Sequence, residues 1–261
     1  MKNGVLLTGL LLVSVPTFGA VVGKPVQYKA DGLTMKGYIA YDDAIAGKRP
    51  GVLVIHEWWG LNDYARRRAD MLAKEGYIAM AVDMYGNGKT ADHPKDASAF
   101  AAAVNKDPAG ALARFRAAMA TLNRQRLADR TRTAAIGYCF GGGQVLNMAR
   151  AGVPILGAVS FHGSLGTDNP AKVGQIKAKI RVFTGAADPM APPAVVKAFE
   201  TEMQGAQANY KVVSYPNAMH AFTNPDADNL GKKFGLPLKY DANADHDSWT
   251  QTLAFLKEIF Q

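Results

Sequence analysis

The amino-acid sequence predicts an α/β fold, with a doubly wound and mostly parallel sheet that is covered by helices on both faces. Short runs of apolar and β-branched residues alternate with longer helical patterns, as expected of repeated β–α–β units. Several central runs are apolar throughout, which is typical of strands that are buried on both faces of a parallel sheet. Because the crossovers of such units share one hand, consecutive units add to a single twisted sheet.

The elements can be placed in order along the chain. The first predicted strand, 33–41 (LTMKGYIAY), alternates apolar and polar residues and is therefore expected at an antiparallel edge. The later strands are more continuously apolar and are predicted at 51–56 (GVLVIH), 77–85 (YIAMAVDMY), 133–139 (TAAIGYC), 157–163 (GAVSFHG), 180–188 (IRVFTGAAD) and 210–216 (YKVVSYP). Helical patterns lie between them, near 63–75, 95–104, 108–126, 141–151, 192–204 and 246–260. No internal repeat interrupts the series, so residues 25–261 are predicted to form one domain.

The first twenty residues are set apart from this domain. Lys2 precedes the apolar run GVLLTGLLLVSV, and small residues surround Gly19 and Ala20, which is the pattern of a secretory signal peptide. The run is shorter than the roughly 20 residues of a membrane-spanning helix, although an uncleaved anchor is the alternative. No cysteine follows the run, which excludes attachment as a lipoprotein. We therefore expect residues 1–20 to be removed and the mature protein to be periplasmic or secreted, without membrane association.

The formal net charge of +8 raises the question of an anionic partner. The basic residues are scattered over helical stretches at 65–70 and 114–132, however, and no aromatic platform or nucleic-acid motif accompanies them. Solvated helix faces explain this charge better, so no nucleic-acid partner is expected. The histidines show no metal-ligand spacing such as H-E-x-x-H, and neither a metal nor another cofactor is expected.

The only cysteine of the chain stands in AAIGYCFGGGQVL (134–146), where an apolar run meets a helical pattern. The triplet Gly137-x-Cys139-x-Gly141 has the shape of the Gly-x-Ser-x-Gly nucleophile elbow, with sulfur in place of oxygen. Such a turn is tight, and glycines two residues to either side avoid collisions with neighbouring backbone. The turn also exposes the sulfur at the N-terminus of the next helix, where the helix dipole favours a thiolate. Cys139 is therefore predicted to be a catalytic nucleophile rather than a small buried apolar residue.

A cysteine nucleophile needs a base, and the base needs an acid that orients it. Because ligands bind beyond the carboxyl ends of the strands in such a sheet, the residues that close the predicted strands are the candidates: His56, Glu57, Asp83, Cys139, His162, Asp188 and, just past a strand, His220. Asp188 and His220 follow the cysteine in the order found in α/β-hydrolases, acid and then histidine. Taken alone, Asp188 could cap the next helix and His220 could be an ordinary loop histidine. Their joint occurrence with the elbow predicts a Cys–His–Asp triad.

These motifs resemble the dienelactone hydrolase family, also called carboxymethylenebutenolidases, within the α/β-hydrolase superfamily. The resemblance runs from about residue 25 to the C-terminus and is carried by HEWWGLN (56–62), AVDMYG (81–86), GYCFGG (137–142), GAADP (185–189) and HAFTNPDAD (220–228). It implies an α/β-hydrolase fold and a glutamate, Glu57, that contacts the thiol of Cys139 and helps to deprotonate it. Partial burial by the neighbouring tryptophans would raise the pKa of that carboxyl, which suits a proton acceptor. A strand-end ion pair of Glu57 with one of Arg66 to Arg68 is the alternative.

The resemblance also implies that the backbone N–H groups of Trp58 and Phe140 stabilise the oxyanion. Two positions depart from the best-known members of the family, in which arginines bind the substrate's carboxylate. Asn87 and Asn224 stand there instead, so the strong two-pronged recognition of a carboxylate is lost and an acidic dienelactone is in doubt as the substrate. The pocket is predicted to include Trp59, Tyr85, Asn87, Tyr138, His162, Phe222 and Asn224. A packing position or a place in the pocket wall is expected for His56, and loop or helix-cap positions are expected for His93 and His246.

The sequence thus predicts a hydrolase that cleaves an ester or lactone through a thioester acyl-enzyme intermediate. Cys139 is the nucleophile, His220 the base and then the acid, Asp188 the residue that orients the imidazole, and Glu57 the group that primes the thiol. Two alternatives stay open: a thioesterase or small-peptide hydrolase on the same scaffold, and a non-catalytic exported binding protein. The expected partner is a small-molecule ester or lactone. The sequence leaves the physiological substrate and the oligomeric state open, a monomer included.

Overall fold

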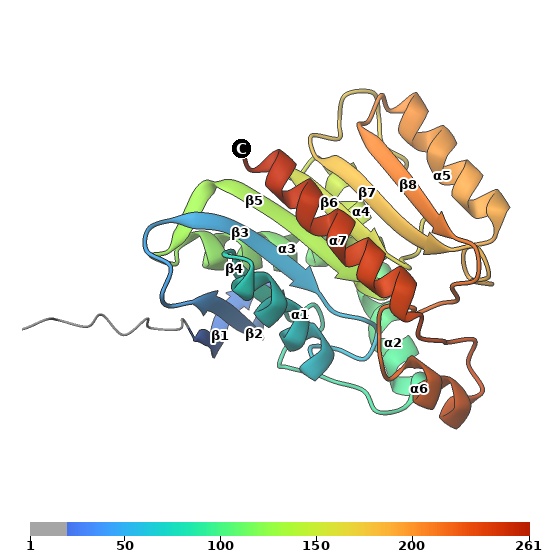
Figure 1. The fold of residues 1–261 in the computed structure, drawn as a ribbon, viewed down its shortest axis with the longest axis horizontal. Helices are drawn as coiled ribbons and strands as arrows, with labels where there is room; N and C mark the ends of the chain where they lie inside the picture. The colour runs from blue at the N-terminus through green and yellow to red at the C-terminus, as the bar shows by residue number, and fades with distance from the viewer. Residues whose placement is uncertain (1–19) are drawn as a thin grey trace, which may run out of the picture.

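The structure, a computed structural model, describes residues 20–261 and contains within them one eight-stranded sheet (Figure 1). The strands lie in the order β1-β2-β4-β3-β5-β6-β7-β8. Their bounds are β1 Val21–Ala30, β2 Leu33–Asp42, β3 Arg49–Ile55, β4 Ile78–Val82, β5 Ala128–Tyr138, β6 Gly157–Phe161, β7 Lys179–Gly185 and β8 Tyr210–Tyr215. β1 and β4 pair with β2 in antiparallel fashion, and all other neighbours are parallel. The predicted fold class is confirmed.

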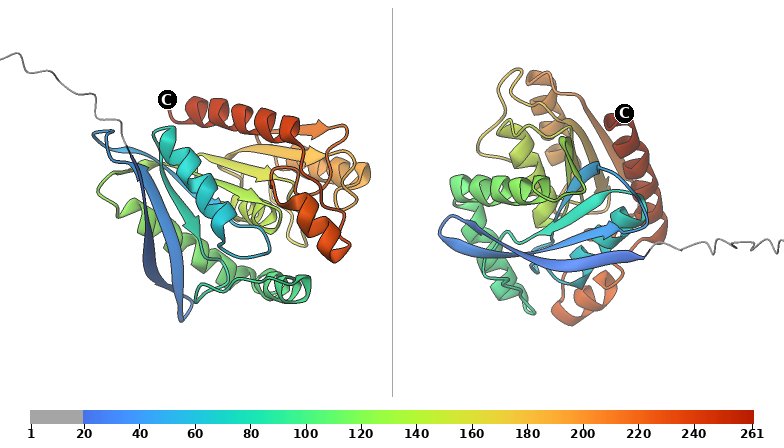
Figure 2. Two further views of the ribbon diagram at one scale, coloured as in Figure 1. Left: turned by 60° about the horizontal axis from the view of Figure 1, so that its bottom comes forward. Right: turned by 90° about the vertical axis from the view of Figure 1, so that its left-hand side faces the viewer.

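Helices cover both faces of this sheet. Their bounds are α1 Asp63–Lys74, α2 Pro94–Asn105, α3 Pro108–Asn123, α4 Phe140–Arg150, α5 Pro193–Gly205, α6 Ala227–Phe234 and α7 Ala242–Ile259. Apolar residues of α1 and α7 form one core with one side of the strands, and those of α3, α4 and α5 form a second core on the opposite side. The sheet lies between these two helix layers in both views of Figure 2.

The parallel winding decides where the functional side chains meet. β3 and β5 to β8 run in one direction, so the segments that follow them emerge at the same edge of the sheet. Glu57 follows β3, Cys139 follows β5, Asp188 follows β7 and His220 follows β8. Four residues separated by up to 163 positions in the sequence are thereby brought to one place.

Two elements of the structure were absent from the sequence prediction. β1 begins before residue 25 and is the true edge strand, so the predicted strand at 33–41 (β2) lies one position inside the edge. β1 carries a glycine and a proline and is mostly exposed, which hides the alternation of a strand. α6 is short and polar, with a glycine inside it, and fully buries only Ala227 and Gly231. Neither element has the apolar periodicity on which the prediction relied.

The predicted signal peptide, residues 1–20, lies outside the described residues except for Ala20. Among residues 20–261, no helix has both the length and the apolar character needed to cross a membrane.

Candidate active site

Cys139 stands in the sharp turn between β5 and α4. Its φ of 52° and ψ of −116° lie outside the regions that most L-residues occupy. A Cβ atom on Gly137 would come within 2.1 Å of the carbonyl oxygen of Gly141, and one on Gly141 within 2.3 Å of the carbonyl oxygen of Ile55. Both contacts are with backbone, which cannot rotate away. The structure therefore requires glycine at both positions of the elbow.

The next glycines let α4 approach its neighbours closely. A Cβ atom on Gly142 would lie 2.7 Å from Ser160 Oγ and 2.9 Å from the Cα of Gly163. At Gly143 the corresponding contact, with the carbonyl oxygen of Ser164, is 3.3 Å. The helix-propensity cost of these glycines, about 1 kcal/mol each, is thus associated with close packing of α4 against β6 and the segment after it.

Cys139, His220 and Asp188 form one chain of hydrogen bonds. His220 Nε2 lies 3.1 Å from Cys139 Sγ, and its Nδ1 donates to Asp188 Oδ2 at 2.8 Å. The second carboxylate oxygen of Asp188 accepts the backbone N–H of Met190 at 2.8 Å. The helix that follows is capped by Pro192, so Asp188 orients the imidazole instead of capping α5. The thiol is half-buried, whereas the histidine and the carboxylate are buried.

The charges and hydrogen bonds around His220 favour its protonated form. Burial alone would lower the pKa of His220, but the charges of Cys139 and Asp188 and the hydrogen bonds to them outweigh it and raise that pKa to about 10. At neutral pH His220 is therefore protonated, and its ring lies between the sulfur of Cys139 and the carboxylate of Asp188. The N-terminus of α4, directly beside the sulfur, adds the positive end of a helix dipole. The resting site thus holds a protonated imidazole next to the sulfur.

Glu57 is buried at the end of β3, beside the same site. Its Oε2 accepts a hydrogen bond of 2.7 Å from Asn224 Nδ2. Burial raises the pKa of Glu57 from 4.5 to about 7, although the hydrogen bond from Asn224 and the charges of His220 and Arg68 lower it. Among the hydrogen bonds of residues 20–261, none joins Glu57 to Cys139, whose sulfur is paired with the imidazole. The priming of the thiol by Glu57 stays a prediction.

The alternative for Glu57, an ion pair with the arginines of α1, does not occur. Arg66 pairs with Asp63 at 3.0 Å, and Arg68 pairs with Asp245 at 2.6 Å. The carboxylate of Glu57 therefore has an amide donor as its partner and is not neutralised by a neighbouring cation at hydrogen-bond distance within the described chain.

The two predicted oxyanion donors flank the thiol. Phe140 is the first residue of α4, so its N–H has no carbonyl partner within the helix. Within the described part of the chain, neither this N–H nor that of Trp58 donates to another protein group. The carbonyl of Trp58 accepts the hydroxyl of Tyr85 at 2.9 Å, which fixes the loop that carries it. Both N–H groups are available to a substrate oxygen, and their catalytic role stays a prediction.

A cavity of about 120 Å³ lies over the triad. Its polar side is formed by Glu57, Cys139 and His220, and the rest of its wall by Trp58, Trp59, Met190, Ala221, Asn224, Leu230, Leu236 and Leu238. α6 and the residues after it supply the three leucines. A bridge between the backbones of His220 and Leu238 ties this wall to the histidine. A larger and more open groove of about 510 Å³, beside Asn62 and Arg66, contains none of the triad residues.

The structure places only part of the predicted pocket on this cavity. Trp59 and Asn224 line it, whereas five other predicted pocket residues do not: Tyr85, Asn87, Tyr138, His162 and Phe222. The hydroxyl of Tyr85 donates its hydrogen bond to the backbone carbonyl of Trp58. Asn87 is exposed in a left-handed turn, with a φ of 59°. Tyr138, His162 and Phe222 are fully buried in a layer behind the triad, where they support it without reaching the cavity.

The remaining strand-end residues and histidines have structural roles. The carboxylate of Asp83 accepts backbone N–H groups at 2.7 to 3.0 Å and so shapes the loop after β4. His56 is buried and packs against the rings of Tyr85 and Phe140, as expected. His93 caps α2, and His246 is exposed near the start of α7.

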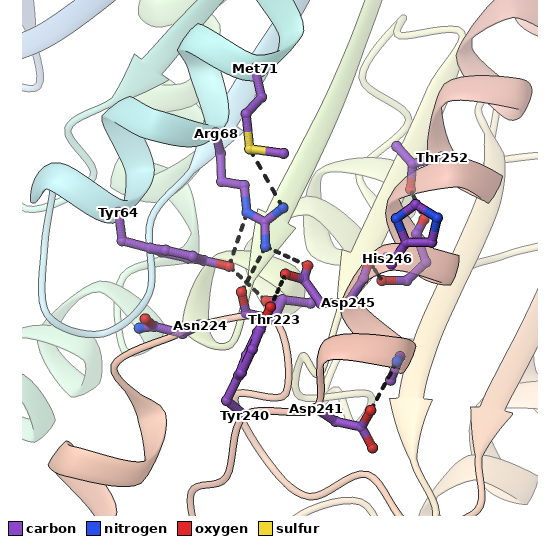
Figure 3. A network of polar contacts seen from close by, with 12 residues as sticks. Tyr64, Arg68, Met71, Thr223, Asn224, Tyr240, Asp241, Asp245, His246 and Thr252 are labelled. Carbon is purple, nitrogen blue, oxygen red and sulfur yellow. Dashed lines mark hydrogen bonds and ion pairs between the residues drawn. The ribbon is translucent and has the colours of Figure 1, made fainter.

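The sequence analysis missed a buried polar network behind the triad (Figure 3). Arg68 donates to the carbonyl of Thr223 at 2.7 Å and to Asp245 at 2.6 Å. The hydroxyl of Thr223 lies 2.6 Å from that of Tyr64 and 2.7 Å from His162 Nε2. The network thereby fixes the loop that begins with the catalytic histidine. Helical spacing could have revealed it, because Tyr64 and Arg68 are four residues apart and share the buried face of α1.

The raised pKa of Glu57 predicts a pH-dependent cost to folding. Between the unfolded-state pKa of 4.5 and the folded-state pKa of about 7, the folded chain retains a proton that the unfolded chain has released. Stability therefore falls as the pH rises through this window. We expect the Glu57→Gln variant to gain on the order of 3 kcal/mol over the parent between pH 4 and pH 8, at about 1.4 kcal/mol per pH unit of pKa shift.

Urea unfolding at several pH values measures this difference. Glu75→Gln removes an exposed carboxylate and serves as the control for the change in net charge. A difference between parent and Glu57→Gln that stays constant from pH 4 to pH 8 would contradict the raised pKa.

An elbow nucleophile, an acid and a histidine, each placed after a strand of a mostly parallel eight-stranded sheet, define an α/β-hydrolase. The profile of the dienelactone hydrolase family matches residues 35–260, and the chain belongs to this family. The resemblance inferred from the sequence is thereby confirmed, and the protein is a hydrolase of that family.

Three similar proteins illustrate the range of the family. Protein usf of Aquifex pyrophilus is 30% identical over 246 residues, which cover 91% of this chain and 99% of its own. A Bradyrhizobium protein named as a probable 2-oxo-3-(5-oxofuran-2-ylidene)propanoate lactonase is 27% identical over 89% of this chain and 92% of its own. The crystal structure of P91, a dienelactone hydrolase-like promiscuous phosphotriesterase from metagenomic libraries, has a TM-score of 0.86 and 35% identity, covering 93% of this chain and all of its own.

Proposed function

We propose that the protein hydrolyses a carboxylic ester or lactone through a thioester formed at Cys139. The observation that carries the proposal is the chain of hydrogen bonds from Cys139 through His220 to Asp188, which opens onto a cavity at the sulfur. The lactonase name of the Bradyrhizobium relative supports this class of substrate.

The geometry supports a two-step reaction. The thiolate attacks the carbonyl carbon, and the resulting oxyanion accepts hydrogen bonds from the N–H groups of Trp58 and Phe140. His220 then gives its Nε2 proton to the leaving alkoxide as the C–O bond breaks, which leaves a thioester on Cys139. In the second step the neutral imidazole takes a proton from water, and the hydroxide attacks the thioester. The thiolate leaves and the acid is released. Asp188 keeps the imidazole in the same orientation throughout.

Glu57 assists the triad in this proposal. Its carboxyl group borders the cavity and, with a pKa of about 7, exchanges a proton near neutral pH. It can accept the thiol proton whenever the sulfur is protonated and turned away from His220. In the conformation described here the imidazole is the nearer acceptor, so Glu57 acts as an auxiliary base.

Hydrolysis of p-nitrophenyl acetate by the purified chain tests the proposal. Turnover is expected, and inertness of a folded protein would support the alternative of a binding protein without catalysis. A panel of lactones, thioesters and aminopeptide substrates then separates the ester or lactone hydrolase from the thioesterase and the small-peptide hydrolase. A neutral phosphotriester belongs in the panel because P91 is named a promiscuous phosphotriesterase.

We also propose that the enzyme acts outside the cytoplasm, on the basis of the signal-like residues 1–20. Expression of the full chain in a bacterial host, followed by N-terminal sequencing of the periplasmic fraction, tests this. A chain that keeps residues 1–20 and stays in the cytoplasmic fraction would contradict it.

A further inference from the structure

Most of the wall of the active-site cavity is apolar. Leu230 of α6, Leu236 and Leu238 after it, and the two tryptophans Trp58 and Trp59 line it. Met190, exposed by 52%, stands at the entrance. Among the described residues that line the cavity, none is a lysine or an arginine. An acyl group bound here would therefore exchange water for hydrocarbon and aromatic surface.

Neither asparagine that stands in place of a carboxylate-binding arginine supplies a positive charge to a substrate anion. Asn87 is exposed and lies away from the cavity. The side chain of Asn224 is held on both sides, because its Nδ2 donates to Glu57 at 2.7 Å and its Oδ1 accepts the backbone N–H of Asp226 at 3.0 Å. The amide of Asn224 therefore orients a carboxylate of the protein itself.

The charged groups nearest to the cavity also disfavour an anion. Glu57 contributes a carboxylate to the wall, and the positive charge of His220 is already shared between Cys139 and Asp188. The guanidinium of Arg68, only 4% exposed, is taken up by the network of Figure 3, in which Thr223 and Asp245 accept its hydrogen bonds. A substrate carboxylate would lose water here without gaining a partner.

The size of the cavity limits the acyl group. The cavity is small, with a volume of about 120 Å³. A short acyl group can lie within it, and a longer chain would have to displace the leucines or extend past Met190.

From these observations, and resting on the hydrolytic function proposed above, we infer that the site is selective for short, uncharged, apolar acyl groups and rejects acyl groups that carry a carboxylate. The selectivity is set by the leucine wall of α6 together with the Glu57–Asn224 pair.

Two amides of the same shape test this inference. In 3-methylbutanamide an isopropyl group occupies the place of the carboxylate of malonamate, and both amides lack an ester leaving group. Each is titrated for its ability to protect Cys139 from alkylation by iodoacetamide at pH 8, with the mass of the single-cysteine chain as the readout. We expect half-protection at a concentration at least tenfold lower for the neutral amide. Equal or better protection by malonamate, or no protection by either, would overturn the inference.

This readout does not require turnover, so the two proposals fail separately. An inert protein that shows the expected protection ratio would refute the proposed hydrolytic function and support the proposed selectivity. An active enzyme that lacks this ratio would support the hydrolytic function and refute the selectivity.

A matched pair of variants tests whether the cavity wall causes the selectivity. Leu236→Lys places an ammonium group in the cavity wall at a partly exposed position and is expected to reverse the preference in favour of malonamate. Val173→Lys adds the same charge at a position that is 66% exposed, before β7 and at the opposite edge of the sheet, and is expected to keep the ratio of the parent. A ratio that both variants change equally would assign the preference to net charge and not to the cavity.

Discussion

Replacement of Cys139 by alanine is expected to abolish ester hydrolysis and to leave folding nearly unchanged. In the proposed mechanism the sulfur is the atom that forms the thioester, and removal of a nucleophile from a triad costs about 10⁴-fold or more in turnover. The side chain is half-buried and caps no helix, so its loss removes little packing. The rate of p-nitrophenyl acetate hydrolysis and the midpoint of urea unfolding measure the two effects. Substantial residual activity would point to another nucleophile.

The serine variant tests whether an alcohol can replace the thiol as the nucleophile. Cys139→Ser keeps the size of the side chain but replaces a thiol by an alcohol of much higher pKa, which a neighbouring imidazole or carboxylate deprotonates with difficulty. We expect turnover close to that of the alanine variant. A serine enzyme as active as the parent would contradict a mechanism that begins from an ionised sulfur.

Replacement of Gly141 by alanine is expected to have the second largest effect. The added Cβ would lie 2.3 Å from the carbonyl oxygen of Ile55 and 2.6 Å from that of His56. Relief of this overlap must move α4 away from the end of β3, and overpacking of this kind costs about 3 kcal/mol at the upper end of its usual range. The same movement separates Cys139 from the loop that carries Glu57 and Trp58. Turnover should therefore fall by about 10²-fold, the loss that misplacement by 1 Å produces.

Gly205→Ala is the control for this variant. Gly205 is likewise a helical glycine, at the last position of α5, but a Cβ atom there would have no neighbour within 4 Å. We expect parental activity and unchanged or slightly higher stability, because alanine favours a helix over glycine. Thermal unfolding and p-nitrophenyl acetate hydrolysis of both variants provide the comparison. Equal behaviour of the two alanine variants would contradict a specific role of the elbow glycine.

The sequence was sufficient for the parts of the fold that have strong local signals. Continuous apolar runs located the central strands, and the glycines around Cys139 located the elbow, because only that residue type fits a turn so close to neighbouring backbone. Because the parallel strands of such a sheet end at the same edge, Asp188 and His220 could then be expected beside the cysteine. β1 and α6 were missed because an exposed edge strand and a short polar helix carry little apolar periodicity.

The cavity wall was harder to predict for a different reason. Nearness in sequence to a catalytic residue does not give the direction of a side chain. Tyr138 precedes the nucleophile, but it is the last residue of β5 and its side chain packs under α1 on the opposite side from the cavity. The leucines that do line the cavity follow the triad histidine by 10 to 18 residues, and they lie in or just after α6, the helix that the sequence did not reveal. Their position depends on tertiary contacts.

The bridge between His220 and Leu238 has a consequence for engineering. One continuous segment of about twenty residues carries the proposed general base at its start and part of the proposed selective wall at its end, and backbone contacts join the two. Loop exchange between relatives would transplant both properties together. Libraries intended to retune acceptance of bulkier acids should therefore diversify leucine side chains within this segment and preserve its length.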